Sequence, residues 1–139
     1  MSKVAVVYWS GTGNTEAMAE EVAAGAREAG ADVDVLQAGD FTPEKVQEYD
    51  GVAFGCPAMG DEVLEETEFE PMYDEVEPEL GDRKVVLFGS YDWGDGEWME
   101  SWQERAEGAD VNVLDTLIVN LEPDDDAKAE CRRIGALIA

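Results

Sequence analysis

Residues 10–15 have the side chains and the spacing that could hold an anion. They follow the apolar run 4–9 and precede an amphipathic segment, so we expect them to form the turn from a buried strand into a helix. The positive end of that helix would face the anion, the glycines would let the main chain approach closely, and the hydroxyls are neutral donors. No Lys or Arg occurs in the segment, which favours a phosphate that is held and not transferred. The segment reads Ser10-Gly11-Thr12-Gly13-Asn14-Thr15.

Two further loops carry residues that could contact a ligand, and each follows an apolar run. The first offers Met59 beside Gly60, and the second offers Tyr91 and Trp93 among glycines and aspartates. A site with large apolar side chains at one end and phosphate donors at the other would fit a flat aromatic ligand with a phosphorylated tail. Each feature also has a structural explanation. The glycines and hydroxyls could form only a capped turn, Met59 could belong to the core, and the acids after Gly60 could be solvated.

A parallel sheet would bring these three loops together. Apolar segments alternate with segments of helical spacing, which predicts an α/β fold with a doubly wound, five-stranded parallel sheet and helices on both faces. In such a sheet the loops at the carboxyl ends of the strands lie at one edge, where ligands bind. Residues 1–139 are expected to form a single domain. The predicted strands are 4–9, 33–36, 51–56, 84–89 and 111–119, and the predicted helices are 16–29, a short one from 43, 69–80, 98–106 and 127–138.

Helix ends can be assigned from single residues. Asn14 or Thr15 is expected to cap the first helix, and Gly30 is expected to end it. In the third helix, Pro71 is expected in the first turn and Pro78 near the end.

Acidic residues dominate the charge of the chain. It has 34 acidic and 9 basic residues and a formal net charge of −25. This balance argues against binding to nucleic acid or to an anionic membrane, both of which need a basic patch. Two explanations remain, and both can hold: an acidic face that steers toward a basic partner, or a whole surface adapted to high salt, where the Debye length falls to about 3 Å. Strong self-repulsion favours a monomer.

The cysteines are expected to be buried, unreactive thiols. Cys56 ends a predicted strand and Cys131 lies in the last predicted helix. With two cysteines and no histidine, the sequence gives no support to a zinc site or to a Cys-His nucleophile. No apolar run approaches membrane-spanning length and no signal-peptide pattern occurs, so a cytoplasmic location is expected.

Together the three loops resemble the flavodoxin family, specifically the short-chain flavodoxins of anaerobic bacteria. The motifs occur in the family's order and spacing, and the resemblance covers essentially the whole chain, including residues 62–71 and 118–120. The fifth predicted strand also continues without a long inserted loop, as in the short-chain members. The motifs are Ser10-Gly11-Thr12-Gly13-Asn14-Thr15, Cys56-Pro57-Ala58-Met59-Gly60 and Gly89-Ser90-Tyr91-Asp92-Trp93-Gly94.

The resemblance implies a strand order of 2-1-3-4-5 and a non-covalently bound flavin mononucleotide (FMN). It implies a low-potential one-electron carrier between redox proteins, and not an enzyme. The partners would be reductases or oxidoreductases with basic docking faces. No nucleic-acid partner and no membrane insertion are expected.

The resemblance also assigns roles to single residues. The phosphate would bind at residues 10–15, and the ring would lie between Met59 and Trp93. Glu62 would accept a hydrogen bond from the flavin N3–H, and main-chain amides of residues 92–94 would meet the pyrimidine edge. Ser90 and Asn120 would lie nearer the ribityl chain. The residues expected to bind FMN are Ser10, Gly11, Thr12, Gly13, Asn14, Thr15, Pro57, Ala58, Met59, Gly60, Asp61, Glu62, Ser90, Tyr91, Asp92, Trp93, Gly94 and Asn120.

By the same resemblance, the Gly60–Asp61 peptide controls the redox steps. Its carbonyl is expected to turn toward the flavin N5 when the ring gains one electron and a proton, which stabilises the semiquinone; glycine tolerates both backbone states. A second electron would leave a negative charge among carboxylates without a nearby cation, which lowers the second potential. Two features depart from similar short-chain flavodoxins. Asp92 stands where they have glycine, and the greater acidity suggests a salt-loving source.

Other functions can be weighed against the same residues. A small FMN-dependent reductase would need a substrate cavity and usually a nicotinamide site, and the chain has no extra domain or basic residue suited to a second phosphate. A flavodoxin-like activator of a metal-radical enzyme is less firmly excluded. A signalling receiver would have paired acids after the first strand, where this chain has Trp9-Ser10-Gly11, and a P-loop hydrolase would have a Lys after the glycines.

Overall fold

Five parallel strands form one sheet in the order β2-β1-β3-β4-β5. This confirms the predicted doubly wound α/β fold. The computed structural model describes residues 2–11, 13–59, 63–92 and 94–139. The strands are β1 (Lys3–Tyr8), β2 (Asp32–Gln37), β3 (Gly51–Gly55), β4 (Lys84–Tyr91) and β5 (Asn112–Asn120).

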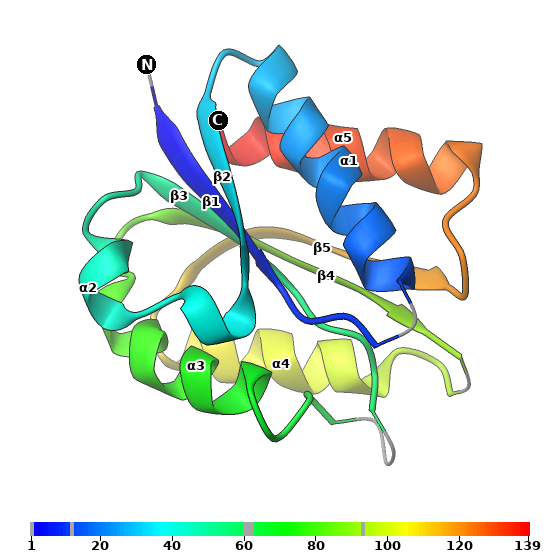
Figure 1. Cartoon of the computed structure of the whole chain (residues 1–139). Helices are drawn as coiled ribbons and strands as arrows, with labels where there is room; N and C mark the ends of the chain where they lie inside the picture. Colours follow the sequence, from blue (N-terminus) through cyan, green and yellow to red (C-terminus); the bar gives the residue numbers. More distant parts are fainter. Residues whose placement is uncertain (1, 12, 60–62, 93) are drawn as a thin grey trace.

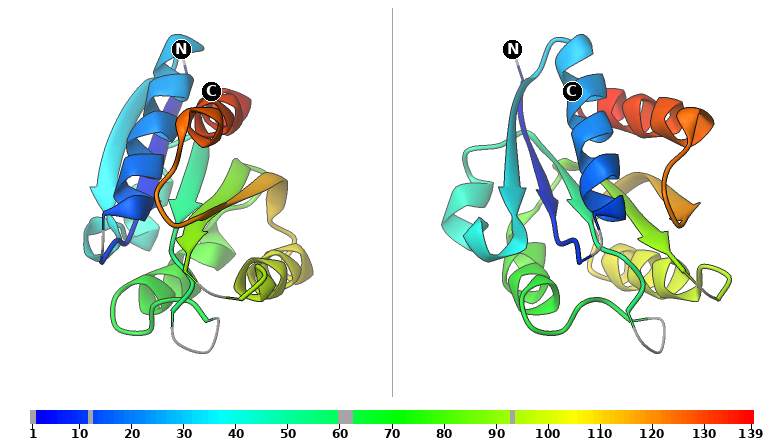
Figure 2. Two further views of the ribbon diagram at one scale, coloured as in Figure 1. Left: turned by 90° about the vertical axis from the view of Figure 1, so that its right-hand side faces the viewer. Right: turned by 45° about the vertical axis from the view of Figure 1, so that its right-hand side comes forward.

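Helices cover both faces of this sheet. Figure 1 shows α1 and α5 on one face and α2, α3 and α4 on the other. Figure 2 shows α1 and α5 crossing each other on their face. The α-helices are α1 (Asn14–Glu28), α2 (Pro43–Val46), α3 (Phe69–Val76), α4 (Glu97–Gly108) and α5 (Asp125–Ile138), and the short 3₁₀ helices are η1 (Ala38–Asp40) and η2 (Glu77–Glu79).

The central strands are apolar along their length because both of their faces are buried. In β1, residues 4–7 have no exposed surface, and alternate side chains enter the two cores. Trp98 and Trp102 of α4 are 1% and 2% exposed, as their helical spacing predicts. The expectation that Cys56 and Cys131 are buried is confirmed; burial raises the pKa of both thiols, that of Cys131 to about 12.

The layer of α1 and α5 depends on two glycines. A Cβ on Gly25 would overlap the carbonyl oxygen of Arg132, and a Cβ on Gly135 would overlap the carbonyl oxygen of Val22. The two main chains therefore meet directly where the helices cross, which no residue larger than glycine would allow. On the opposite face of the sheet, Arg105 of α4 forms ion pairs with Glu70 and Asp74 of α3 and with Glu77 of η2.

Several predicted boundaries need correction. β3 ends at Gly55, one residue before Cys56, and β4 runs two residues further than expected, to Tyr91. The third helix changes to 3₁₀ geometry after Val76, because Pro78 has no N–H for a helical hydrogen bond. Within the described residues, no helix combines the length and the apolar content that crossing a membrane requires.

The strand ends place three loops at one edge of the sheet, as predicted. The first loop (residues 9–13) joins β1 to α1, the second loop (56–68) joins β3 to α3, and the third loop (92–96) joins β4 to α4. Both chain ends lie at the opposite edge (Figure 1).

Candidate functional site

The start of α1 is shaped by a glycine and a serine in the first loop. Gly13 is the N-cap residue with φ +96°, and its N–H donates to Ser10 Oγ at 3.0 Å. Asn14 and Thr15 were expected to cap this helix, and that prediction is wrong: both lie inside its first turn. Because the cap residue is a glycine, it has no side-chain oxygen that could accept a hydrogen bond from the first N–H groups of this 15-residue helix. This end of α1 can receive an anion.

Thr15 connects the first turn of α1 to the carboxyl end of β4. Its Oγ1 lies 3.0 Å from Ser90 Oγ, and it accepts a weaker hydrogen bond of 3.4 Å from the Ser90 N–H. Thr15 and Ser90 are 1% and 4% exposed, which makes them two of the few buried polar residues described. The structure therefore brings together two predicted ligand residues that are 75 positions apart in the chain.

Main-chain hydrogen bonds continue beyond the strands and fix the starts of the loops. The N–H of Trp9 donates to the Gly55 carbonyl at 3.0 Å, and the N–H of Ala58 donates to the Ser90 carbonyl at 3.1 Å. Trp98 also donates from Nε1 to the Cys56 carbonyl, at 3.2 Å. The three loops are thus held against one another at their bases, and Pro57 and Ala58 of the second loop are half-buried.

Met59 of the second loop pairs with Val63 as an isolated antiparallel bridge. The Met59 N–H donates to the Val63 carbonyl at 2.9 Å, and the Val63 N–H donates to the Met59 carbonyl at 3.1 Å. Met59 is half-buried, whereas Val63 is 40% exposed. The predicted ligand residues Thr12, Gly60, Asp61, Glu62 and Trp93 lie outside the described residues.

Asn120 holds the third loop from the end of β5. Its Nδ2 donates to the carbonyls of Tyr91 at 3.2 Å and Asp92 at 3.4 Å. The Tyr91 ring packs against Trp98, with a centroid distance of 5.6 Å. The Asn120 amide and the Tyr91 ring therefore support the third loop at its start, whereas Asp92 and Gly94 are exposed.

A cavity of about 280 Å³ borders the first loop on the side of β2. Two carboxylates line it, and one of them, Glu16, accepts a hydrogen bond from Tyr8 Oη at 3.0 Å. Burial and this contact raise the pKa of Tyr8. A phosphate would be repelled by such walls, so the first main-chain N–H groups of α1 are the better anion site. The lining residues are Tyr8, Trp9, Ser10, Glu16, Gln37 and Glu68.

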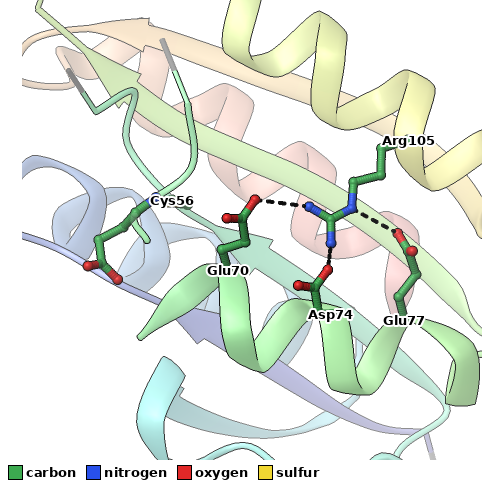
Figure 3. A network of polar contacts seen from close by, with 6 residues as sticks. Cys56, Glu70, Asp74, Glu77 and Arg105 are labelled. Carbon is green, nitrogen blue, oxygen red and sulfur yellow. Dashed lines mark hydrogen bonds and ion pairs between the residues drawn. The ribbon is translucent and has the colours of Figure 1, made fainter. Parts of the chain in front are cut away.

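Among the described residues, the basic side chains make their ion pairs outside the three loops. None of the three loops contains a Lys or Arg. Figure 3 shows Arg105 surrounded by Glu70, Asp74 and Glu77, with Cys56 on a neighbouring segment. The site consequently consists of neutral donors with carboxylates nearby.

Glu65 is a site residue that sequence reasoning missed. It is 4% exposed, and its carboxylate accepts hydrogen bonds from the N–H groups of Thr67 (2.8 Å), Glu68 (2.7 Å) and Phe69 (2.8 Å) and from the Thr67 hydroxyl. Burial alone would raise the pKa of this carboxyl. The four donors outweigh burial and hold the pKa below its ordinary value. The available signal was a polar residue just before an apolar helix, but the acidic run 65–68 conceals which acid is buried.

Comparisons with known proteins point to a single family. The sequence profile of the family described as Flavodoxin matches residues 6–135. A flavodoxin from Megasphaera elsdenii is 47% identical over 136 residues, covering 98% of each chain. A flavodoxin from Clostridium beijerinckii is 49% identical over 135 residues, covering 96% of this chain and 97% of its own.

Solved structures agree with the sequence comparisons. The solution structure of two-electron reduced Megasphaera elsdenii flavodoxin superposes with a TM-score of 0.89 at 46% identity, covering 98% of this chain and 99% of the other. A flavodoxin from the domain Archaea gives a TM-score of 0.88 at 28% identity, covering 99% of this chain and 96% of the other.

Proposed function

Because the chain belongs to the flavodoxin family, it is an FMN-binding electron-transfer protein and not an enzyme, and we propose that the loops after β1, β3 and β4 hold its FMN. The observation that carries this proposal is the buried contact between Thr15 and Ser90, which joins the start of α1, directly after the first loop, to the end of β4. When bound, FMN supplies the redox chemistry by accepting and releasing electrons one at a time.

The phosphate is proposed to bind at the start of α1. Neutral hydroxyls and main-chain N–H groups converge there, the positive end of a 15-residue helix faces the ligand, and a Cβ at Gly13 would meet nothing within 4 Å. The donor set fits a phosphate group, because it offers several hydrogen bonds without a counter-charge. The proposed phosphate ligands are Ser10, Gly11, Thr12, Gly13, Asn14 and Thr15.

The second and third loops are proposed to hold the ring and the ribityl chain. Met59 would cover one face of the ring and Trp93 the other, with Glu62 accepting from the flavin N3–H. Both loops follow strands that end at the carboxyl edge of the sheet, and Met59 of the second loop is half-buried, which supports this assignment. The remaining proposed contacts are Pro57, Ala58, Gly60, Asp61, Ser90, Tyr91, Asp92, Gly94 and Asn120.

The charges around the site favour a low reduction potential. No Lys or Arg lies in the three loops, and Glu16 and Glu68 lie beside the first loop. Added negative charge is unfavourable in a low-dielectric site near carboxylates and without a cation. The chain's own residues would therefore make the bound, reduced flavin a strong electron donor.

The net charge of −25 supports three finer proposals, on the redox partners, the oligomeric state and the source. The redox partners present basic docking faces, since opposite charge steers association. The protein is a monomer because of its self-repulsion, and it comes from a salt-rich setting, where carboxylates repel one another less. It works in the cytoplasm, where its two free thiols would stay reduced. Residues 1–139 form one FMN-binding domain.

FMN titration of Thr15 variants tests the binding site. Thr15→Val keeps the side-chain shape but removes the hydroxyl, leaving buried Ser90 without its partner. We expect the FMN dissociation constant to rise about tenfold, the effect of losing roughly 1.4 kcal/mol. Thr15→Ser restores the hydroxyl and should bind FMN nearly as the wild type does. Equal affinities for the wild type and Thr15→Val would contradict the proposed phosphate site.

A further inference from the structure

Glu65 joins two segments that meet at the proposed flavin site. Its carboxylate caps the start of α3 through three main-chain N–H groups, and its own carbonyl accepts from the Glu70 N–H at 2.8 Å. Its own N–H donates to Cys56 Sγ at 3.3 Å, directly after β3. One buried residue therefore connects the end of the strand to the beginning of the helix.

The same connection closes the second loop at its base. Cys56 is fixed on its other side, because its N–H donates to the Phe88 carbonyl at 3.0 Å and its carbonyl accepts from Trp98. Two residues before Glu65, Val63 is paired with Met59. The position of Met59 thus depends on two sets of contacts, the Ala58 hydrogen bond to β4 and the bridge to Val63 that leads into Glu65.

A residue that only caps a helix does not need to be buried as Glu65 is. α5 is capped by Asp124, whose exposed side chain accepts one hydrogen bond from the Ala127 N–H at 2.8 Å. Glu65 instead places a carboxylate in the protein interior, which is unfavourable unless several donors compensate. Its four donors all come from residues 67–69, so the chain is fixed in one conformation from Glu65 into α3.

We propose that Glu65 is a positioning residue for electron transfer, which holds the second loop where the flavin ring needs it. This rests on the proposed function, because it requires FMN to lie against Met59. Glu65 acts through the loop and does not contact the flavin. Its loss should weaken FMN binding and bring the two one-electron midpoint potentials closer together, since a loosened loop no longer favours one redox state of the ring over another.

Two pairs of variants separate positioning from charge. Glu65→Gln removes a charge and sets an amide group against main-chain N–H donors, whereas Glu66→Gln removes the same charge from the exposed neighbour. Thr67→Val removes one donor to Glu65 without any change of charge, and Thr67→Ser keeps that donor. Asp124→Ala serves as the control for a lost helix cap outside the three loops.

FMN affinity, the two midpoint potentials and the melting temperature of the FMN-free protein are measured for every variant. We expect Glu65→Gln to raise the FMN dissociation constant at least about tenfold and to narrow the gap between the potentials more than Glu66→Gln does. Thr67→Val should change both quantities in the same direction, by less, and Thr67→Ser should restore them. Asp124→Ala should lower the melting temperature and leave the gap unchanged.

The proposal is overturned if Glu65→Gln matches Glu66→Gln in affinity and in the gap, or if Thr67→Val matches wild type. Should Glu65→Gln fail to fold, the Thr67 pair decides alone. Failure of wild type to bind FMN would instead refute the proposed function, so the two failures are distinguishable.

Discussion

At the scale of single residues, Asp92 adds an exposed carboxylate to the third loop, one position before Trp93. The resemblance to short-chain flavodoxins implies a glycine at this position. A negative charge near the ring opposes the second electron, so Asp92→Gly should raise the potential for that electron. Solvent screens an exposed charge, and the shift should be roughly 20–40 mV at low salt and smaller at high salt.

Potentiometric titration of Asp92→Gly beside Asp92→Asn measures this effect. The asparagine variant removes the charge but keeps a side chain, so a similar rise in both variants assigns the shift to charge. An unchanged or lower potential in both would rule out an electrostatic role for Asp92.

The residue types in the sequence indicated which segments could bind a ligand, but they did not indicate which contacts each side chain makes. Hydroxyls at Thr15 and Ser90 were expected in the site, and their direct contact followed only once the sheet was formed. Asn14 or Thr15 was expected to cap α1; instead Gly13 takes the left-handed cap position, and the Thr15 hydroxyl contacts that of Ser90. Glu65 could not be distinguished from the acids beside it, because its burial depends on how the second loop folds back onto Cys56.

At the scale of elements, the crossing of α1 and α5 offers a sharp test of packing. Gly135→Ala would place a methyl group on the main chain of Val22, and the helices would have to separate. We expect a loss of about 1–3 kcal/mol in the free energy of unfolding, typical of overpacking. Gly108→Ala in α4 is the matched control, because its Cβ would meet nothing within 4 Å, and it should be neutral or stabilising by up to about 1 kcal/mol.

Urea denaturation of the FMN-free variants gives both values. If Gly135→Ala is as stable as Gly108→Ala, the direct contact between the α1 and α5 main chains is not as described.

The sequence predicted which segments are strands and which are helices more accurately than it predicted where they end. Short apolar runs bounded by turn residues favour strands of a covered parallel sheet, and the spacing of Cys131, Ile134 and Ile138 favours the inner face of a helix. Ends depend on partners instead. β4 continues to Tyr91 because Asn120 and Leu121 supply hydrogen bonds from β5, and no local pattern signals that pairing.

At the scale of the whole molecule, the net charge of −25 must oppose folding at low ionic strength. Salt screens repulsion between exposed carboxylates, so the melting temperature should rise steadily from dilute buffer to molar KCl. A matched series in a low-charge flavodoxin would show a smaller rise. A melting temperature that falls with added salt would contradict adaptation to high salt.

Stepwise reduction of the FMN-loaded protein, followed by absorption and potential together, tests whether the chain is a one-electron FMN carrier. We expect flavin bands in the loaded protein and two separate one-electron steps, with the second at a markedly lower potential. A protein that takes up no FMN, or whose flavin is reduced in a single two-electron step, would contradict it.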